Sequence, residues 1–557
     1  MSLRSHSDDV NAPAPARSPF LASRFTSSRV LTIQTPSGRW EALADRILGF
    51  LRADVIALAC DGVPVRGFRS PDSPALWIRD HSDILRGGVY VEADVWSAVE
   101  AFARSQSANG RVFDFVTTKP TPQNRENWET WVRVPVEADV EYRFVKAAYL
   151  AWQASGDDAR LQVILPALQR ALTYTRTHAD RWDDTHGLVK RPYTIDTWDF
   201  DYTAGRVPWL NFQITEATFW GLSHADNSGF FEAAALLSAL YAHMGTRHLA
   251  AYWRTEAAEL RERANTALWN GRFYTHFHPI VLVEVDGQSV EAPHADERLS
   301  LSNPMAVNRG LATHAMAEAI LDEYARRGAE GRAFAPWWSV DPPFPDGFFG
   351  DEKLVGGAYV NGGILPLVGG ELALAAFEHG REAFGVDTLA VYAELVARTG
   401  ETYLWYAPDG SPSTVDTSTS PEATPTDGWG ASAMLYALTR GLAGVRDEGH
   451  SFGSIRLAPR WMATGEDEAA VRLAYEASGA GFAYTYRHDP AARTVRLTLE
   501  GHADVALSLL LPEGARATAL VWNGALAPVT AATVGASAYA RGTGRVDGHA
   551  TVEVGYA

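Results

Sequence analysis

The spacing of apolar residues changes from a helical period to a strand-like period near residue 449. Upstream of that point, apolar side chains recur every three or four residues, which is the spacing of one helical face. The loops between these stretches are rich in Gly, Pro, Trp and Asp, which favours helical hairpins over α/β alternation. The helices that the pattern predicts span residues 40–51, 140–156, 161–174, 230–244, 250–269, 307–327, 363–378, 386–398 and 430–443.

The predicted helices run in pairs from about Leu76 to Val445. At roughly 30 residues for each helix and its loop, this stretch of ~370 residues accommodates a closed ring of about six hairpins. The hairpins are too dissimilar in sequence to form a solenoid repeat. The predicted fold class is therefore mainly α, an (α/α)6 toroid.

After Gly449, apolar and polar residues alternate with period two. Turn residues bound the alternating segments, which span 471–475, 482–486, 494–499 and 505–509. This pattern predicts a C-terminal β-sandwich. The expected organisation is a disordered or extended segment at 1–29, a helical domain with a short lead-in at 30–448, and the β-sandwich domain at 449–557.

The net charge of the chain limits the kinds of partner that it is expected to bind. The 557 residues carry a formal net charge of −18, whereas nucleic acids and anionic membranes require basic surfaces. We therefore expect neither as a partner, and no apolar run approaches the ~18 residues of a membrane span. The 18 tryptophans and 20 tyrosines suit a cleft that binds carbohydrate, and the oligomeric state is left open.

Cysteine and histidine usage argues against a metal or a cofactor. Cys60 is the single cysteine, so neither an intrachain disulfide nor a cysteine-based metal site is expected. His224, His276 and His278 are scattered or on loops, without the spacing of a metal site. Residues 1–29 lack the apolar run of a secretory signal, which makes a cytoplasmic location the expectation.

One octapeptide, residues 194–201, concentrates the candidate chemistry. It reads Thr-Ile-Asp-Thr-Trp-Asp-Phe-Asp and includes Asp196, Trp198 and Asp199 between two predicted helices. A carboxyl group against an indole ring has a raised pKa and keeps a proton near neutral pH. The alternative is a solvated acidic loop with one anchoring aromatic residue.

Three further loops carry polar residues at helix starts. Trp77-Ile78-Arg79-Asp80 opens the first hairpin, where an ion pair with a capping role is the alternative to ligand binding. Asn361 precedes two glycines that suit a close backbone approach to a ligand or a tight turn. A long polar loop contains Asp416 and Glu422, and Trp429 follows it at the start of the last helix. This loop suits either a catalytic carboxylate or a lid.

These motifs together resemble the six-hairpin glycosidases, the clan of glucoamylases, trehalases, mannosyl-oligosaccharide glucosidases and α-L-rhamnosidases. Residues 77–80 are similar to the Trp-x-Arg-Asp of glucoamylases, and Thr197-Trp198-Asp199-Phe200 to the Gly-Trp-Asp-Phe of trehalases. Trp429-Gly430 and Ile455-Arg456-Leu457-Ala458-Pro459 resemble the end of the barrel and the start of the β-domain in rhamnosidase-like enzymes. The resemblance covers most of residues 76–557.

The resemblance implies an exo-acting, inverting glycoside hydrolase that releases a terminal, glucose-like sugar. Asp199 would be the general acid, with Glu422 or Asp416 as the base, and the two carboxyl groups would lie ~6.5–9.5 Å apart. The expected substrate-binding residues are Trp77, Arg79, Asp80, Asp196, Trp198, Asn361 and Trp429.

The sequence departs from the clan where the catalytic base usually stands. That place reads Leu404-Trp405-Tyr406, without a carboxylate, so the base is expected from the longer loop or from Glu401 just before it. Two alternatives follow: an α-L-rhamnosidase-like glycosidase, and a catalytically inactive carbohydrate-binding protein.

Overall fold

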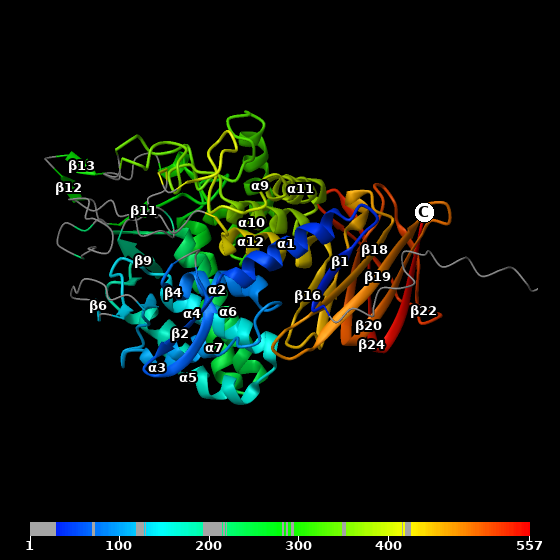
Figure 1. The fold of residues 1–557 in the computed structure, drawn as a ribbon, viewed down its shortest axis with the longest axis horizontal. Coiled ribbons are helices and arrows are strands. Elements are labelled where there is room, and N and C mark those ends of the chain that lie inside the picture. Colours follow the sequence, from blue (N-terminus) through cyan, green and yellow to red (C-terminus); the bar gives the residue numbers. More distant parts are fainter. Residues whose placement is uncertain are drawn as a thin grey trace, which may run out of the picture.

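A computed structural model provides the three-dimensional description of the chain. The residues that the structure describes are 29–69, 73–118, 127–128, 130–192, 196, 214, 218, 220–280, 283–285, 288–290, 295–347, 352–414, 416–417 and 425–557. Helices dominate the first part of the chain and strands the last part, and Figure 1 shows the two parts side by side.

The helical domain is built from α1 to α12. The helices are α1 (Arg39–Ala53), α2 (Ile78–Gly88), α3 (Ser97–Ser105), α4 (Val140–Ser155), α5 (Asp158–Thr177), α6 (His224–His243), α7 (Arg247–Ala267), α8 (Ser302–Asn308), α9 (His314–Gly328), α10 (Pro366–Glu378), α11 (Glu382–Thr399) and α12 (Gly428–Tyr436), which continues as the π-helical η2 (Ala437–Leu442). The expected helices are confirmed with one exception. The segment 307–327 is divided between α8 and α9, because Gly310 adopts a φ of 85° and Thr313 caps the second helix.

The even-numbered helices follow one another in a closed cycle of contacts. Each of α2, α4, α6, α8 and α10 packs against the next, and α12 packs back against α2. Every residue of α2 is buried. The intervening helices bury one face only, as α7 does with Ala250, Trp253, Ala257, Leu260 and Ala264. The buried helices are therefore inner and the half-exposed ones outer.

Short strands occupy the segments around the N-terminal ends of the inner helices. They are β2 (Val55–Cys60), β3 (Val63–Phe68), β4 (Ala75–Trp77), β5 (Phe115–Thr117), β6 (Asn127–Trp128), β7 (Trp131–Val132), β8 (Trp182–Asp183), β9 (Leu188–Pro192), β10 (Trp220–Leu222), β11 (His278–Pro279), β12 (Val283–Val285), β13 (Gln288–Val290), β14 (Leu299–Ser300) and β15 (Val340–Asp341), with η1 (Ala295–Glu297) between β13 and β14. Figure 1 shows β6, β9, β11, β12 and β13 at the end of the helical domain that faces away from the C-terminal strands.

The C-terminal part and β1, from the N-terminal range expected in the helical domain, form one hydrogen-bonded sheet of ten strands. They are β1 (Leu31–Gln34), β16 (Val445–Asp447), β17 (Ser454–Leu457), β18 (Glu468–Ala474), β19 (Gly481–Asp489), β20 (Thr494–Leu510), β21 (Ala517–Trp522), β22 (Ala525–Ala527), β23 (Thr530–Val534) and β24 (Ser537–Tyr556), and η3 (Trp461–Thr464) precedes β18. The order is β1-β18-β19-β20-β24-β21-β22, with β17 also paired to β20 and β23 to β24. The segments 494–499 and 505–509, expected as two strands, are one strand, β20, which passes through Gly501 at a φ of 147°.

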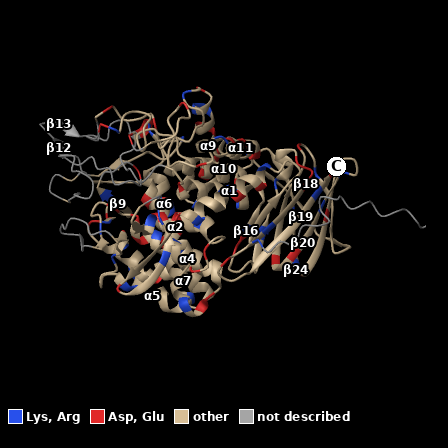
Figure 2. Cartoon of the chain, viewed as in Figure 1, with Lys and Arg blue, Asp and Glu red and all other residues tan. Residues whose placement is uncertain are grey.

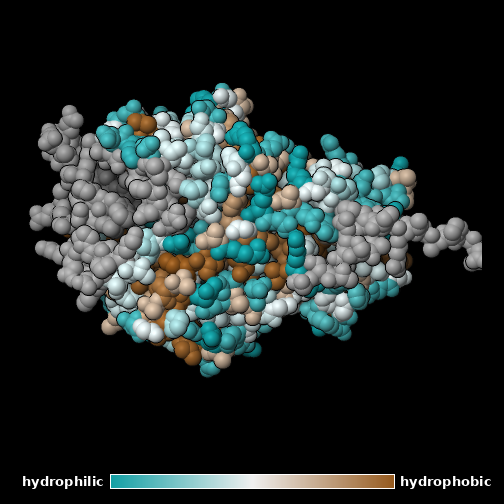
Figure 3. Space-filling view, viewed as in Figure 1, coloured by the Kyte–Doolittle hydropathy of each residue, from teal (hydrophilic) through white to brown (hydrophobic). Residues whose placement is uncertain are grey.

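The two parts share a continuous core. One cluster of buried apolar residues runs from the inner helices into the sheet. Buried Arg460 reaches Glu378 of α10 at 3.4 Å, and Tyr539 of β24 donates a hydrogen bond to Glu382 of α11. Figure 3 shows apolar residues gathered on the face of the helical domain beside the sheet. Among the helices in the described part of the chain, none combines the length and apolar character required to cross a bilayer.

Candidate functional site

Polar groups gather where the inner helices begin. The first turn of an α-helix leaves backbone N–H groups without intrahelical partners, and side chains here satisfy several of them. Asp427 accepts hydrogen bonds from the backbone N–H groups of Trp429 (3.2 Å) and Gly430 (2.8 Å), and Ser223 caps α6. Figure 2 shows acidic and basic residues side by side around α2, α4 and α6.

A chain of buried ion pairs, here called the polar chain, links these helix starts. Its members are Arg79, Asp83, Glu137, Asp139, Arg143, Arg191 and Asp226. Arg191 lies between Asp226 at 3.3 Å and Glu137 at 2.9 Å. Arg79 contacts Glu137 at 2.6 Å and binds both carboxylate oxygens of Asp139, at 2.6 and 2.8 Å.

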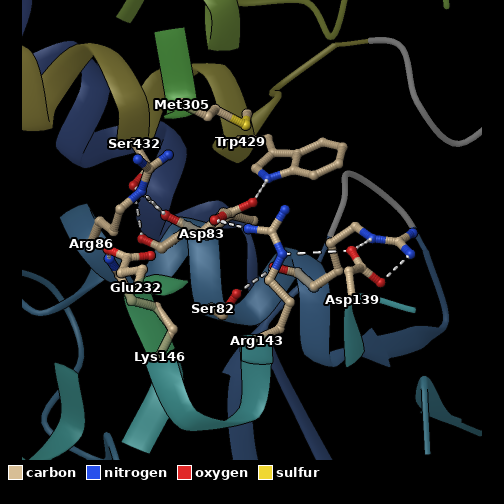
Figure 4. A network of polar contacts seen from close by, with 12 residues as sticks. Ser82, Asp83, Arg86, Asp139, Arg143, Lys146, Glu232, Met305, Trp429 and Ser432 are labelled. Carbon is tan, nitrogen blue, oxygen red and sulfur yellow. Dashed lines mark hydrogen bonds and ion pairs between the residues drawn. The ribbon is translucent and has the colours of Figure 1, made fainter. Parts of the chain in front are cut away.

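The polar chain continues through α4 into α2 and reaches α12. Arg143 lies 3.6 Å from Asp139 and donates a hydrogen bond to Asp83. The second carboxylate oxygen of Asp83 accepts a hydrogen bond from the indole Nε1 of Trp429 at 2.7 Å. Figure 4 shows Asp139, Arg143, Asp83 and Trp429 in this succession. The Arg79 and Trp429 motifs, far apart in sequence, therefore belong to one connected group.

Burial sets the electrostatics of this group. None of the side chains in the polar chain is more than 8% exposed. Burial opposes ionisation of Asp83, but the charges of Arg143, Arg86 and Arg309 outweigh it and hold its pKa below the ordinary value. Burial raises the pKa of Asp226 despite its contact with Arg191. The charges within the polar chain thus largely compensate one another, and the polar chain forms a rigid support for the site.

Asp80 and Asp427 bring carboxyl groups to the same region from the first and last inner helices. Both are buried, at 7% and 1% exposed. Burial raises the pKa of Asp427 to about 7, and the negative charge of Asp80 adds to the shift. A carboxyl group that keeps its proton near neutral pH can donate a hydrogen bond or a proton.

Of the remaining predicted residues, some lie outside the described part of the chain and the others are placed by the structure. Trp198, Asp199 and Glu422 lie outside the described residues. Asp196 is buried at a φ of 51° and accepts hydrogen bonds from the hydroxyl and the backbone N–H of Ser302, at the start of α8. Asp416 is exposed.

Three further residues that the sequence predicted, Asn361, Trp77 and Glu401, contact neighbouring parts of the chain. The amide of Asn361 donates to the carbonyls of Phe344 and Leu354 and accepts from the N–H of Phe344 at 2.7 Å. These contacts correspond to the tight-turn alternative. Trp77 packs against Phe115, with ring centroids 3.9 Å apart. Glu401 accepts a hydrogen bond from the hydroxyl of Thr426 at 3.0 Å.

Five residues of the site were not predicted from the sequence: Glu137, Asp139, Arg143, Arg191 and Asp427. For Arg143 a signal exists, because it is a charged residue inside the apolar stretch 140–151 of a helix that is otherwise buried. Charged residues are almost never fully buried unless they are paired, so Arg143 implies a buried carboxylate nearby. Within the described ranges, no group of three or more His, Cys, Asp or Glu side chains is arranged to hold a metal ion.

Comparison with known proteins gives structural relatives only. No family model matches the chain, and no curated protein does. Among solved structures, a GH78 rhamnosidase of Bacillus sp. GL1 has a TM-score of 0.58 at 17% identity, over 87% of this chain and 43% of its own. An α-L-rhamnosidase from Dictyoglomus thermophilum has a TM-score of 0.57 at 11% identity, over 95% and 50%. A structure described as a sialidase has a TM-score of 0.58 at 11% identity, over 92% and 41%.

The chain spans half or less of the length of these three structures. At such low identity the likeness establishes the fold. The described elements agree with it, since a helical domain is followed by a large and mostly antiparallel sheet. The chain therefore shares the fold of these structures, in which a helical domain is joined to a β-domain.

Proposed function

We propose that this protein is a glycoside hydrolase whose helical domain is an (α/α)6 toroid and whose site lies at the N-terminal ends of the inner helices. It removes a terminal, glucose-like sugar from a small glycoside or oligosaccharide and inverts the anomeric centre. Asp199 protonates the departing glycosidic oxygen. Glu422, or else Asp416, activates water on the opposite face of the sugar.

The other predicted residues bind the sugar. Arg79 and Asp80 contact its hydroxyl groups, with Asp196 beside them, while Asn361 holds its own turn together. Trp77, Trp198 and Trp429 form apolar walls that exclude water, which keeps the acid protonated. No metal or cofactor takes part in this scheme.

The observation that carries the proposal is the hydrogen bond from Trp429 to Asp83 and its continuation to Arg79. The partners of this hydrogen bond lie 346 residues apart in sequence. The bond joins the N-terminal end of the last inner helix, α12, to the middle of the first, α2. Asp199 precedes α6 in the sequence and lies outside the described residues. Fixed dipoles in a buried setting stabilise the charge that develops during a reaction, because they do not have to reorganise. Cleavage of a glycosidic bond requires stabilisation of this kind.

Replacing Asp199 tests the acid. The Asp199→Asn variant should lose about 10²–10⁴-fold in kcat while it still binds the sugar in calorimetry. The loss should be larger for alkyl glycosides than for dinitrophenyl glycosides, because a good leaving group needs little protonation. Wild-type activity in this variant, or an equal loss for both substrate classes, would remove Asp199 from the role.

Replacing the loop carboxylates separates the two candidate bases. Glu422→Gln and Asp416→Asn are compared with Asp409→Asn, whose carboxylate is exposed in the same region of the chain. The proposal expects a large loss of kcat in Glu422→Gln and none in the control. Proton NMR of the first sugar released then gives the anomer, and retention of configuration would contradict the inverting mechanism.

Two alternatives have support of their own. The first two structural relatives are described as rhamnosidases, which favours testing aryl α-L-rhamnosides beside glucosides. The absence of a carboxylate at Tyr406, which is buried, favours a catalytically inactive carbohydrate-binding protein. Sugar binding without release of any monosaccharide across the panel would select that alternative.

A further inference from the structure

Two histidines from neighbouring helices meet at the edge of the helical domain. His314 is the first residue of the outer helix α9, and His379 is the C-cap residue of the inner helix α10, which lies beside α9 (Figure 1). Their Nδ1 atoms are 2.7 Å apart, which is hydrogen-bond distance. The ring planes are parallel to within 18°, and the ring centres are 4.9 Å apart.

These distances fix how the two rings face each other. The separation of the ring centres nearly equals the Nδ1–Nδ1 distance plus the two short distances from each ring centre to its own Nδ1. The two nitrogens therefore lie close to the line between the ring centres. The rings meet edge to edge, and each Nδ1 points at the other.

Protonation decides whether this contact can form. In a neutral imidazole one nitrogen donates a hydrogen bond and the other accepts one, whereas an imidazolium donates from both. Two neutral rings, or one neutral and one protonated ring, can share a hydrogen between their Nδ1 atoms. Two protonated rings cannot, because each presents an N–H group and a positive charge to the other. Acid solution therefore abolishes a contact that neutral solution allows.

The nearest carboxylates compensate one positive charge on the pair. Glu318 of α9 lies 3.6 Å from Nε2 of His314. Glu378 precedes His379 in α10 but is paired with two arginines of the C-terminal part, listed here by number as 456 and 460. Glu318 can thus balance a single proton on the pair, whereas Glu378 is already shared by two guanidinium groups.

The other charged groups near the pair are engaged with one another. At the start of α11, Arg381 contacts Asp322 at 2.6 Å, and Glu382 accepts hydrogen bonds from two side chains of β24. On β16, Arg446 contacts Glu448 at 3.0 Å. These pairs do not offer a second counter-charge to the histidines.

The surroundings of His379 disfavour its protonation. Burial lowers the pKa of His379, the charge of His314 lowers it further, and Glu378 and Glu318 act in the opposite direction. The folded protein therefore binds this proton less tightly than the unfolded chain does. The resulting contribution to stability is complete above about pH 6.5 and is lost as the pH falls below that value.

The backbone behind His379 is held by the sheet. Ser537 of β24 donates a hydrogen bond to the carbonyl of Gly380 at 3.4 Å. A Cβ atom on Gly380 would lie 2.0 Å from the carbonyl oxygen of Val534, and one on Gly535 would lie 3.0 Å from that of His379. The two backbones are thus in close contact, and the end of α10 is fixed from the side of the sheet.

His379 also lines an internal cavity. The cavity has a volume of about 360 Å³, and Arg143 of the polar chain lines it as well. The His314 side chain is 50% exposed. Because His379 is fixed and His314 borders solvent, His314 is the ring that turns outward when the contact breaks.

We propose that the contact between His314 and His379 is a pH-sensitive latch between α9 and α10. The latch is closed while at least one ring is neutral and opens when solvent protons occupy both rings. Closed, it covers the cavity wall at His379. Open, His314 turns into solvent and this part of the wall is uncovered.

A double-mutant cycle measures the latch. His314→Ala, His379→Ala and the double variant are compared with wild type by their denaturation midpoints. At about pH 8, where histidines are neutral, the double variant should lose less than the sum of the losses in the single variants, because either substitution removes the same contact. At about pH 4.5 its loss should equal or exceed that sum. Losses that add at pH 8, or the same coupling at both pH values, would overturn the proposal.

A second pair of histidines provides the matched control. The rings of His186 and His278 are 5.6 Å apart and at 72° to each other, and Nδ1 of His186 contacts Asp183 at 2.6 Å. The losses caused by His186→Ala and His278→Ala should therefore add at about pH 8. Coupling as large as that of the latch would show that proximity alone produces the effect and would refute the assignment.

Crystal structures of the unmodified protein at the two pH values test the latch without relying on variants. The Nδ1 atoms should be within hydrogen-bond distance at about pH 8 and separated at about pH 4.5. Nδ1 atoms in contact at both pH values, or at neither, would contradict the proposal.

Discussion

At the scale of single residues, the ion pair of Arg143 and Asp83 is the contact most sensitive to substitution. Their side chains are 2% and 7% exposed. Removing one partner from a buried pair leaves an uncompensated charge, which costs about 3–5 kcal/mol. Arg143→Met should therefore lower the free energy of unfolding by about that amount in denaturant titrations.

The control for this prediction is a pair of similar geometry at the surface. Arg496 and Glu553 lie 2.6 Å apart and are 56% and 39% exposed, and exposed pairs contribute about 0–1 kcal/mol. Arg496→Met should thus have little effect. If the two variants lost equal stability, the structural importance of the polar chain would be contradicted.

Asp427 predicts a dependence of stability on pH. Burial raises its pKa to about 7 in the folded state, above the ordinary value near 3.9. The folded protein therefore holds the proton more tightly than the unfolded chain. This contribution to stability is complete below about pH 4 and is lost as the pH rises through about 7.

Asp427→Asn tests that contribution and keeps a residue suited to the N-cap of α12. Relative to wild type, the variant should gain stability as the pH increases from 5 to 8, measured as the denaturation midpoint at each pH. Asp157→Asn, at the partly exposed N-cap of α5, controls for the loss of a capping carboxylate. A difference between wild type and Asp427→Asn that is constant with pH would contradict the assignment.

At the scale of elements, the junction between η2 and β16 depends on Gly444. Its φ is 69°, and a Cβ atom there would approach the carbonyl oxygen of Ala458 to 1.9 Å. Gly444→Ala should therefore destabilise the protein by more than the ~1–3 kcal/mol of backbone strain alone. Gly400, at the C-cap of α11, has a φ of 74° and open space around it, so Gly400→Ala measures the strain without the clash. Thermal unfolding that ranked Gly400→Ala as the more damaging would contradict this account.

The elements themselves could largely be predicted from the sequence. Most inner helices carry enough apolar residues at helical spacing to be recognised, as 140–156 does for α4. The inner helix α2 is not among the predicted helices, since it buries charged residues such as Arg79, Asp83 and Arg86. The predicted ends of helices and strands are wrong where the backbone conformation of a glycine decides them. Gly310 divides one apolar run into α8 and α9, and β20 continues through Gly501 although the alternation pauses there.

At the scale of the whole molecule, sequence reasoning could not supply contacts between distant segments. Nothing local to Trp429 indicates that its indole meets Asp83, because that contact depends on how α12 packs against α2. The pairing of β1 with β18, from Leu31 opposite Leu473 to Gln34 opposite Ala470, is equally remote. The motifs around Arg79 and Trp429 could be found from sequence, whereas the ion pairs that join them required the fold.

The central claim is that a sugar binds where the N-terminal ends of the first and last inner helices meet. Crystals soaked with glucose and with L-rhamnose test it most directly, because electron density locates the sugar independently of turnover. The account predicts a pyranose in contact with Arg79, Asp80 and Trp429, with Asp199 near its anomeric carbon. A sugar bound instead in the cavity beyond Arg143, or no sugar at these helix ends at saturating concentration, would contradict it.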